Sequence, residues 1–371
     1  MKKIKLVFVL NNFLIGGVEK FLLDLIENFN RERFDIRIVT ISGSGPLYEK
    51  YKNLNLPIFS SGFPYNPSSV IKKIIWWICA PYNITRLSLF IKKEKADIVI
   101  SSMYKADIFS LFLPKKTKTV SIQHDIAKIN PLFRLLKIIA LKRTDQIIAI
   151  SESAKNFLGD YFSIKPSKIK VIFNGINFEK FLRFQKRDSD WIPLFGVVAR
   201  LEKIKGHFYL LKALKKLKEN GKFPKFLFIG DGKERKKIEL FLKTNDLKNV
   251  KMIGAKKEID DIMKKIDIFV LPSLSEGLGI SLIEALTSKK LIIASDVGGI
   301  KEIIKKNTTG LLTKPSDSKD IYKAINWVLE NKDEAIEMRN FSFEWISKNR
   351  NLFDIKKTAE KYSKIFEELL I

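Results

Sequence analysis

Two glutamates, Glu276 and Glu284, lie eight positions apart in the stretch SLSEGLGISLIEAL (residues 273–286). The pattern predicts a glycine-containing loop with the first carboxylate and a helix with the second. The free amides near Leu278 and Gly279 would form the N-terminus of that helix, which favours an anion. The stretch is therefore predicted to bind hydroxyl groups and a phosphate. The alternative is a capping acid followed by an exposed helix acid.

Two basic residues in the stretch GVVARLEKIKGH suit the same ligand. Arg200 directly follows a predicted strand, and Lys205 precedes the next predicted helix. Arginine presents a planar fork of donors and lysine a point charge, so the two can converge on one pair of phosphates. The chain holds 68 lysines and arginines, so the evidence for Arg200 and Lys205 is their location after a strand and not their residue type. Phosphate-binding cations beside diol-binding carboxylates predict a nucleotide-sugar ligand.

The first half of the chain offers weaker candidates. Gly16 and Gly17 follow the strand IKLVFVL, where glycines permit close approach of a ligand to a helix N-terminus. No G-x-G-x-x-G motif is present, so a nicotinamide dinucleotide is not supported. His124 follows the strand KTVSI; a lone histidine is more often a packing or surface residue, but the strand end favours a functional one. For His207, in the first turn of a helix, a capping or surface role is predicted.

These residues depend on strands that alternate with helices along the whole chain, which predicts an α/β fold with parallel sheets covered by helices. The rhythm breaks in a charged connection at residues 176–191 and then restarts. We predict two doubly wound, Rossmann-like domains facing a central cleft, with ligands at the carboxyl ends of the strands. The predicted bounds are 1–180 for the first domain, 181–350 for the second and 351–371 for a C-terminal helix.

Length and composition agree with two domains. The 371 residues exceed one ordinary core, and 46% are hydrophobic. The single cysteine, Cys79, allows no internal disulfide and fits a reducing cytosolic setting. No apolar run approaches membrane-span length, and the start MKKIKLVFVLNN is interpreted as a strand rather than a signal peptide. The D-x-D at Asp188–Asp190 lies in the connection and not at a strand end, so no metal is expected.

The net charge of +27 predicts an anionic partner. From Lys50 to Lys93 there is no acidic residue, while Trp76 and Trp77 lie within the span. One interpretation is a patch that rests on an anionic membrane, where each basic residue adds about 1 kcal/mol. The other is a solvated basic face over a buried helix. Residues 130–143 have a similar mixed character. No nucleic-acid-binding motif is present, so nucleic acid is not an expected partner.

The Glu276-to-Glu284 pattern, E-x7-E, resembles that of the family 4 retaining glycosyltransferases of the two-Rossmann GT-B fold. The resemblance covers nearly the whole chain, through GGVEK, SESAKNFL, KVIFNGIN, ARLEKIKG, FIGDG, SDVGGIKEII and TGLL. It implies a UDP- or GDP-sugar donor, no metal or other cofactor, and a glycan or lipid-linked acceptor. The basic, tryptophan-bearing first domain suggests that this acceptor lies at a membrane, as in cell-surface polysaccharide or lipopolysaccharide biosynthesis, with the protein in the cytoplasm and in peripheral contact with the inner face of the plasma membrane.

The resemblance also implies roles for the second-domain residues. Arg200 and Lys205 would neutralise the donor diphosphate, and Glu284 would bind the ribose hydroxyls. Glu276 would hold the donor sugar and position it without attacking it. The acceptor hydroxyl would then attack from the face that the diphosphate leaves, with retention of configuration.

The remaining implied roles concern backbone groups and the first domain. The amides of Leu278 and Gly279 would assist at the donor sugar, although the family often has an aromatic residue where this chain has Leu278. Gly16 and Gly17 would lie near the phosphates, and His124 would contact the donor sugar close to the reacting carbon. The final helix would cross back to the first domain.

Two other functions stay open from the sequence. A non-hydrolysing sugar-nucleotide epimerase shares the fold, but it would need acids and bases around C2 of the sugar. A basic membrane- or nucleic-acid-binding protein without catalysis would explain the charge but not the E-x7-E pattern.

Overall fold

The computed structural model describes residues 2–43, 45–60, 82, 84–114, 116–124, 126–183, 193–256 and 258–371. By its internal contacts the chain forms two compact units. Unit 1 comprises residues 1–175 and 355–371, and unit 2 comprises residues 176–354. Four features named above lie outside the described residues: Cys79, the pair Trp76 and Trp77, the Asp188–Asp190 motif and the middle of the acid-free span.

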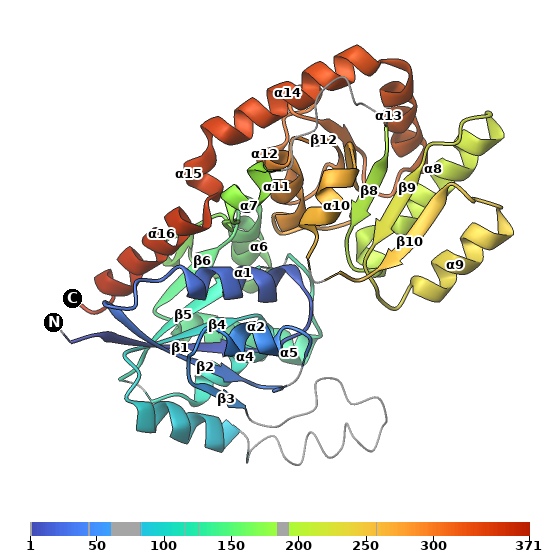
Figure 1. Cartoon of the computed structure of the whole chain (residues 1–371). Helices are drawn as coiled ribbons and strands as arrows, with labels where there is room; N and C mark the ends of the chain where they lie inside the picture. The colour runs from blue at the N-terminus through green and yellow to red at the C-terminus, as the bar shows by residue number, and fades with distance from the viewer. Residues whose placement is uncertain are drawn as a thin grey trace. The chain divides into compact units, whose positions relative to one another are not determined.

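Unit 1 is built on a parallel sheet in the order β3-β2-β1-β4-β5-β6-β7. Its strands are β1 (Ile4–Leu10), β2 (Phe34–Thr40), β3 (Ile58–Ser60), β4 (Ile98–Ser102), β5 (Lys118–Gln123), β6 (Gln146–Ala149) and β7 (Ile169–Val171). Strands such as IKLVFVL are apolar nearly throughout because helices cover both faces of the sheet. The strand order reverses between β1 and β4, which makes that junction the topological switch point of unit 1 (Figure 1).

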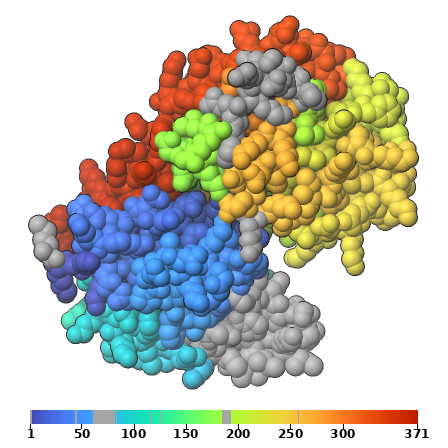
Figure 2. Space-filling model, viewed as in Figure 1, coloured from blue at the N-terminus to red at the C-terminus, as the bar shows by residue number. Residues whose placement is uncertain are grey.

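The helices of unit 1 connect these strands. They are α1 (Gly17–Glu27), α2 (Tyr48–Lys52), a helix that includes residues 84–94, α4 (Tyr104–Phe109), η1 (Ser110–Phe112), α5 (Pro131–Arg143), α6 (Glu152–Phe162), η2 (Pro166–Lys168) and α16 (Ile355–Glu368). The last of these returns from the far end of the sequence. Phe366 of α16 packs against Phe29 and Phe34, with ring centroids 5.7 and 6.3 Å apart. Figure 2 shows the red atoms of this segment beside the blue N-terminal residues.

Unit 2 holds a second parallel sheet, in the order β10-β9-β8-β11-β12-β13. Its strands are β8 (Phe195–Val198), β9 (Phe226–Ile229), β10 (Val250–Gly254), β11 (Ile268–Leu271), β12 (Leu291–Ser295) and β13 (Leu311–Thr313). The order reverses between β8 and β11, so this sheet also has a switch point. The core lies between the sheet and the helices packed on it, notably α8 and α13.

The helices of unit 2 follow the same alternation. They are α7 (Phe178–Leu182), η4 (Lys203–Lys205), α8 (His207–Glu219), α9 (Arg235–Thr244), α10 (Asp260–Lys265), α11 (Ile280–Thr287), α12 (Ile300–Ile303), α13 (Ser318–Glu330), α14 (Lys332–Lys348) and α15 (Arg350–Phe353). The prediction of two doubly wound α/β domains is confirmed. Within the part of the chain that the structure describes, no helix is long and apolar enough to cross a bilayer.

Candidate active site

The switch point of unit 2 brings two predicted site residues into contact. Lys205 ends η4 after β8, and Glu276 lies in the loop between β11 and α11. Because β8 and β11 are parallel neighbours, both loops leave the same edge of the sheet. The Lys205 Nζ lies 2.5 Å from the Glu276 Oε1, and the Ser273 hydroxyl donates to the same oxygen at 2.8 Å. The Glu276 carboxylate, with hydrogen bonds from Lys205 and Ser273, therefore lies at the carboxyl edge of the unit 2 sheet.

Backbone contacts without side chains hold these two loops together. Gly206 adopts a φ of +68°, and a Cβ at this position would lie 1.9 Å from the Pro272 carbonyl oxygen. The Leu274 amide donates to the Ile204 carbonyl at 2.8 Å, which joins the loops a second time. Glycine is required here both for the left-handed backbone and for the close approach.

The ion pair between Lys205 and Glu276 is only partly buried, with 17% and 10% of the two side chains exposed. A ligand phosphate can therefore replace the carboxylate at the ammonium, and a ligand hydroxyl can replace the ammonium at the carboxylate. Arg200, which follows β8, is exposed at the same edge. Glu284 lies within α11 and is only 3% exposed, so the alternative of an exposed helix acid is wrong.

The N-terminus of α11 is shaped by glycines as well. Gly279 is the N-cap residue, with a φ of +86° and no side-chain cap, while the Leu278 side chain is buried. A Cβ on Gly299 would lie 2.3 Å from the Gly277 carbonyl oxygen, and the Gly299 amide donates to the Glu276 carbonyl. The loop before α12 thus supports the Glu276 loop from behind.

The unit 1 candidates lie at the carboxyl ends of β1 and β5. Gly16 caps α1 in extended backbone and Gly17 is the first helical residue. A Cβ on Gly16 would meet only the end of the flexible Glu19 side chain. His124 directly follows β5 and is 6% exposed, and its ring packs edge-on against Phe21 at 5.6 Å.

Neither ring nitrogen of His124 has a hydrogen-bond partner within the described residues. Burial, and secondarily the positive charge of Lys137, lower the pKa of His124 to about 3. The ring is therefore neutral at physiological pH. It can donate or accept one hydrogen bond but is not poised as a general acid.

His207 contradicts its prediction. The residue begins α8 but is only 3% exposed, because its ring packs towards the sheet at 5.7 Å from Phe228. Burial, followed by the charge of Lys205, lowers its pKa to about 4. The expected surface or capping role is wrong, since the first turn of α8 points this side chain inward.

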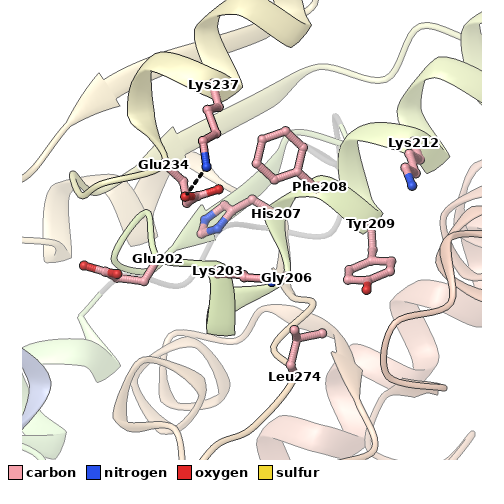
Figure 3. Close-up of a pocket in the computed structure, with 10 residues that line it drawn as sticks. All are labelled: Glu202, Lys203, Gly206, His207, Phe208, Tyr209, Lys212, Glu234, Lys237 and Leu274. Carbon is pink, nitrogen blue, oxygen red and sulfur yellow. Dashed lines mark hydrogen bonds and ion pairs between the residues drawn. The ribbon is translucent and has the colours of Figure 1, made fainter.

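A cavity of about 290 Å³ lies beside the start of α8, within unit 2 (Figure 3). Its lining residues are Glu202, Lys203, Gly206, His207, Phe208, Tyr209, Lys212, Glu234, Lys237 and Leu274. Neither Lys205 nor Glu276 lines it, so it is separate from the ion pair described above. The Lys237 ammonium pairs with the Glu234 carboxylate at 3.1 Å.

Comparison with known proteins decides the family. The model described as Glycosyltransferase Family 4 matches residues 15–180, and the one described as Glycosyl transferases group 1 matches residues 179–345. The chain belongs to the family 4 glycosyltransferases. Both matches fall on the α/β units with the predicted motifs.

Relatives of this glycosyltransferase match most or all of its length. It is 26% identical to the Escherichia coli UDP-Gal:alpha-D-GlcNAc-diphosphoundecaprenol alpha-1,3-galactosyltransferase, over 100% of this chain and 98% of that protein. It is 25% identical to the Campylobacter jejuni N,N'-diacetylbacillosaminyl-diphospho-undecaprenol alpha-1,3-N-acetylgalactosaminyltransferase, over 87% and 88%. Anabaena HepE, solved with UDP and glucose, shares the fold with a TM-score of 0.83 at 19% identity, over 98% and 99% of the chains.

Two functional candidates of this glycosyltransferase escaped prediction from sequence. Ser273 donates to Glu276, and the only signal was a hydroxyl three residues before the acid. Asp107 is fully buried beside Lys137 in unit 1, and no motif marks either residue. Among the described residues no three histidine, cysteine or acidic side chains are grouped as a metal site.

Proposed function

We propose that this glycosyltransferase moves a sugar from a UDP- or GDP-sugar to a lipid-linked glycan, with retention of configuration. The observation that carries the proposal is the pair of Lys205 and Glu276 at the switch point of unit 2. The ammonium suits a donor phosphate and the carboxylate suits sugar hydroxyls. The names of the two bacterial relatives support an undecaprenyl-diphosphate-linked acceptor, and the E. coli relative supports a UDP-sugar. The pathway that fits is cell-surface polysaccharide or lipopolysaccharide biosynthesis.

The leaving diphosphate is stabilised by protein groups in this proposal. Lys205, Arg200 and the amides at the start of α11 meet the charge that develops as the bond from the sugar carbon to the phosphate oxygen breaks. Such charge-assisted hydrogen bonds contribute roughly 1.5–3 kcal/mol each. These cations supply the role that a divalent metal has in other transferases, so the proposed reaction needs no added metal.

Glu276 positions the donor sugar and does not act as a nucleophile. Before the donor binds, its Oε1 accepts from Lys205 and Ser273; when the donor phosphates bind Lys205, sugar hydroxyls take the place of the ammonium at this carboxylate. The acceptor hydroxyl attacks on the face that the diphosphate leaves and gives its proton to the leaving phosphate oxygen. Glu284 binds the ribose, and neutral His124 offers a hydrogen bond to the donor sugar. A covalent sugar ester on Glu276, trapped with a slow donor, would contradict this assignment.

A thermal-shift panel tests the proposal. UDP, GDP and ADP are each added with EDTA or with Mg²⁺ to the wild type, Glu284→Ala, Lys205→Ala and the control Lys203→Ala. A ligand at 100 times its Kd stabilises the protein by about 2.7 kcal/mol. We expect one of the three nucleotides to raise the Tm of the wild type and of the control in the presence of EDTA. The Tm of Glu284→Ala and of Lys205→Ala should not change. No shift with any nucleotide would contradict the donor assignment.

We also propose peripheral contact with an anionic membrane at the cytoplasmic face. Helix α5 exposes Leu132 and Leu135 at 57% each and Ile139 at 42%, at positions that share one helix face. Lys142 and Arg143 are exposed at its C-terminal end. An apolar stripe with a basic end suits the interface of an anionic bilayer.

Sedimentation with liposomes tests the membrane contact. The wild type should sediment with anionic and not with neutral vesicles, and the double variant Leu132→Gln/Leu135→Gln should lose that binding. Leu240→Gln is the matched control, because Leu240 is 65% exposed on α9 of unit 2. Equal binding to both kinds of vesicle, or equal effects of the two variants, would contradict a role for α5.

A further inference from the structure

Unit 1 contains a buried carboxylate with four partners. The Asp107 side chain is 0% exposed. Its Oδ1 accepts from the Ser101 hydroxyl at 2.7 Å and from the Ser121 hydroxyl. Its Oδ2 accepts from the Gln123 amide at 2.8 Å and lies 3.7 Å from the Lys137 Nζ. We call these five residues the Asp107 cluster.

The topology explains how one carboxylate reaches so many partners. Ser101 of β4 and Ser121 of β5 are direct neighbours in the parallel register. Gln123 lies two residues after Ser121 and so shares its face of the sheet. Asp107 comes from α4 and Lys137 from α5, the helices that follow these two strands. The cluster therefore links β4, α4, β5 and α5 at the carboxyl edge of the sheet.

Stability alone does not account for this arrangement. Lys137 is 8% exposed at its side chain, and its Nζ lies 4.9 Å from the centre of the Phe162 ring. Removing two charges from water costs about as much as their attraction returns, and apolar residues of similar volume are often at least as stabilising. A buried pair with added hydrogen bonds fixes geometry more than it adds stability.

What the cluster fixes is the end of β5. The Gln123 side chain donates both to Asp107 and to the Ser121 hydroxyl, so its position is set twice. His124 is the next residue, and its own ring nitrogens have no partner within the described residues. Nothing polar on the ring holds it in place. Its position depends on the peptide it shares with Gln123 and on packing against Phe21.

We propose that Asp107 and Lys137 are positioning residues that hold His124 where it meets the donor sugar. The inference rests on the proposed function, in which His124 contacts the sugar near the reacting carbon. Displacement of a substrate-contacting group by about 1 Å can lower turnover about a hundredfold. Loss of the cluster should therefore lower kcat. It should leave KM for the nucleotide-sugar unchanged, because the residues proposed to bind the nucleotide lie in unit 2.

Asp107→Asn and Asp145→Asn form the matched test. Asp145 anchors the other end of the same strand, where its Oδ2 accepts from the Thr119 amide at 2.8 Å and the Thr119 hydroxyl at 3.0 Å. Steady-state kinetics with the nucleotide-sugar and denaturation midpoints are measured for both variants. We expect both to lose stability, but only Asp107→Asn to lower kcat by about a hundredfold with an unchanged KM.

Rescue separates positioning from misfolding. Asp107→Asn leaves the buried Lys137 ammonium unpaired, whereas Asp107→Asn/Lys137→Met is neutral. The new amide oxygen accepts from the two serines, and the new amide nitrogen donates to Gln123 once the terminal amide of Gln123 turns to present its oxygen. The double variant should regain most of the lost kcat. Equal kcat values for Asp107→Asn and Asp145→Asn, or no rescue in a folded double variant, would overturn the positioning role alone. A wild type without nucleotide-sugar turnover would overturn the proposed function together with it.

Discussion

The two units each place a carboxylate at the carboxyl edge of their sheet, and the two carboxylates differ in access to solvent. Asp107 of unit 1 is fully enclosed, with partners from two strands and a helix. Glu276 of unit 2 is 10% exposed at its side chain and has Lys205 and Ser273 as partners. One site is closed and the other is open.

This difference in exposure suits the Asp107 cluster to a structural role and the pair of Lys205 and Glu276 to ligand binding. The open pair can exchange its mutual contact for ligand groups, because water and ligands reach both charges. The closed pair cannot exchange partners without leaving a buried charge unpaired, which is strongly destabilising. Similar chemistry at equivalent edges therefore supports opposite functions, and four experiments test the contrast.

The largest effect is expected from Lys205→Ala in the open pair. Loss of its charge-assisted contacts to the donor phosphates should lower kcat/KM by about a hundredfold, at roughly 1.5–3 kcal/mol per contact. Lys203→Ala is the control, because Lys203 is exposed two residues away and lines the separate cavity. Steady-state kinetics with the nucleotide-sugar check both. Equal losses would show that the general basic charge matters and not this ion pair.

Gly206→Ala should damage the junction that keeps the open pair together. A Cβ would lie 1.9 Å from the Pro272 oxygen at a φ of +68°, so we expect a loss of about 2 kcal/mol in unfolding free energy. Gly221→Ala is the control, since Gly221 has a φ of +73° but no atom within 4 Å of the added Cβ. Denaturant unfolding should show the smaller loss there. Equal losses would mean that backbone strain, and not the contact between loops, dominates.

Acid should weaken both units through one buried histidine each. The pKa of His124 is lowered to about 3 and that of His207 to about 4, so below the ordinary value of about 6.5 only the unfolded chain takes up the proton. Each histidine should therefore lower stability by roughly 1.4 kcal/mol per pH unit as the pH falls from about 6.5 to about 4. Chemical denaturation at several pH values measures this slope for the wild type, His124→Phe and His207→Phe. Unchanged slopes in both variants would contradict the assignment.

The smallest effects compare one serine from each cluster. Ser273→Ala removes a donor from the open carboxylate and should lower kcat/KM about fivefold, the equivalent of about 1 kcal/mol, with little change in stability. Ser121→Ala removes a donor from the closed carboxylate and one of the two acceptors of Gln123, so it should lower stability by about 1–3 kcal/mol and lower kcat less than Asp107→Asn does. Kinetics and denaturation of both variants give the comparison. The reverse pattern would exchange the roles of the two clusters.

Sequence patterns were sufficient for the fold and for the location of the loops. Apolar runs such as IKLVFVL and the alternation of strands with helices predicted two doubly wound domains, because parallel strands are buried on both faces. The spacing of Arg200, Lys205 and Glu276 placed them on loops after strands. It did not give the partner of each charge, because partners depend on which strands are neighbours.

Burial is where prediction from the sequence failed. His207 was expected to cap its helix or lie at the surface, and nothing was predicted for Asp107, although both side chains are almost fully enclosed. The direction in which a helix presents a polar residue depends on how that helix packs. One polar residue does not change the hydrophobic period of its helix, so the sequence does not show whether that side chain is buried.

The sequence by itself determined the period of each element and the alternation of strands and helices along the chain, since these follow from local steric preference and hydrophobic pattern. Only the tertiary structure decided that Ser101 and Ser121 lie side by side, that Asp107 covers them, and that Lys205 meets Glu276. The physical reason is strand pairing: Ser101 and Ser121 meet because β4 and β5 are neighbours in register, and Lys205 meets Glu276 because the strand order reverses between β8 and β11. The reversal in unit 2 brings together loops that are far apart in the chain and leaves Glu276 within reach of a ligand, whereas helices α4 and α5 enclose Asp107 over β4 and β5.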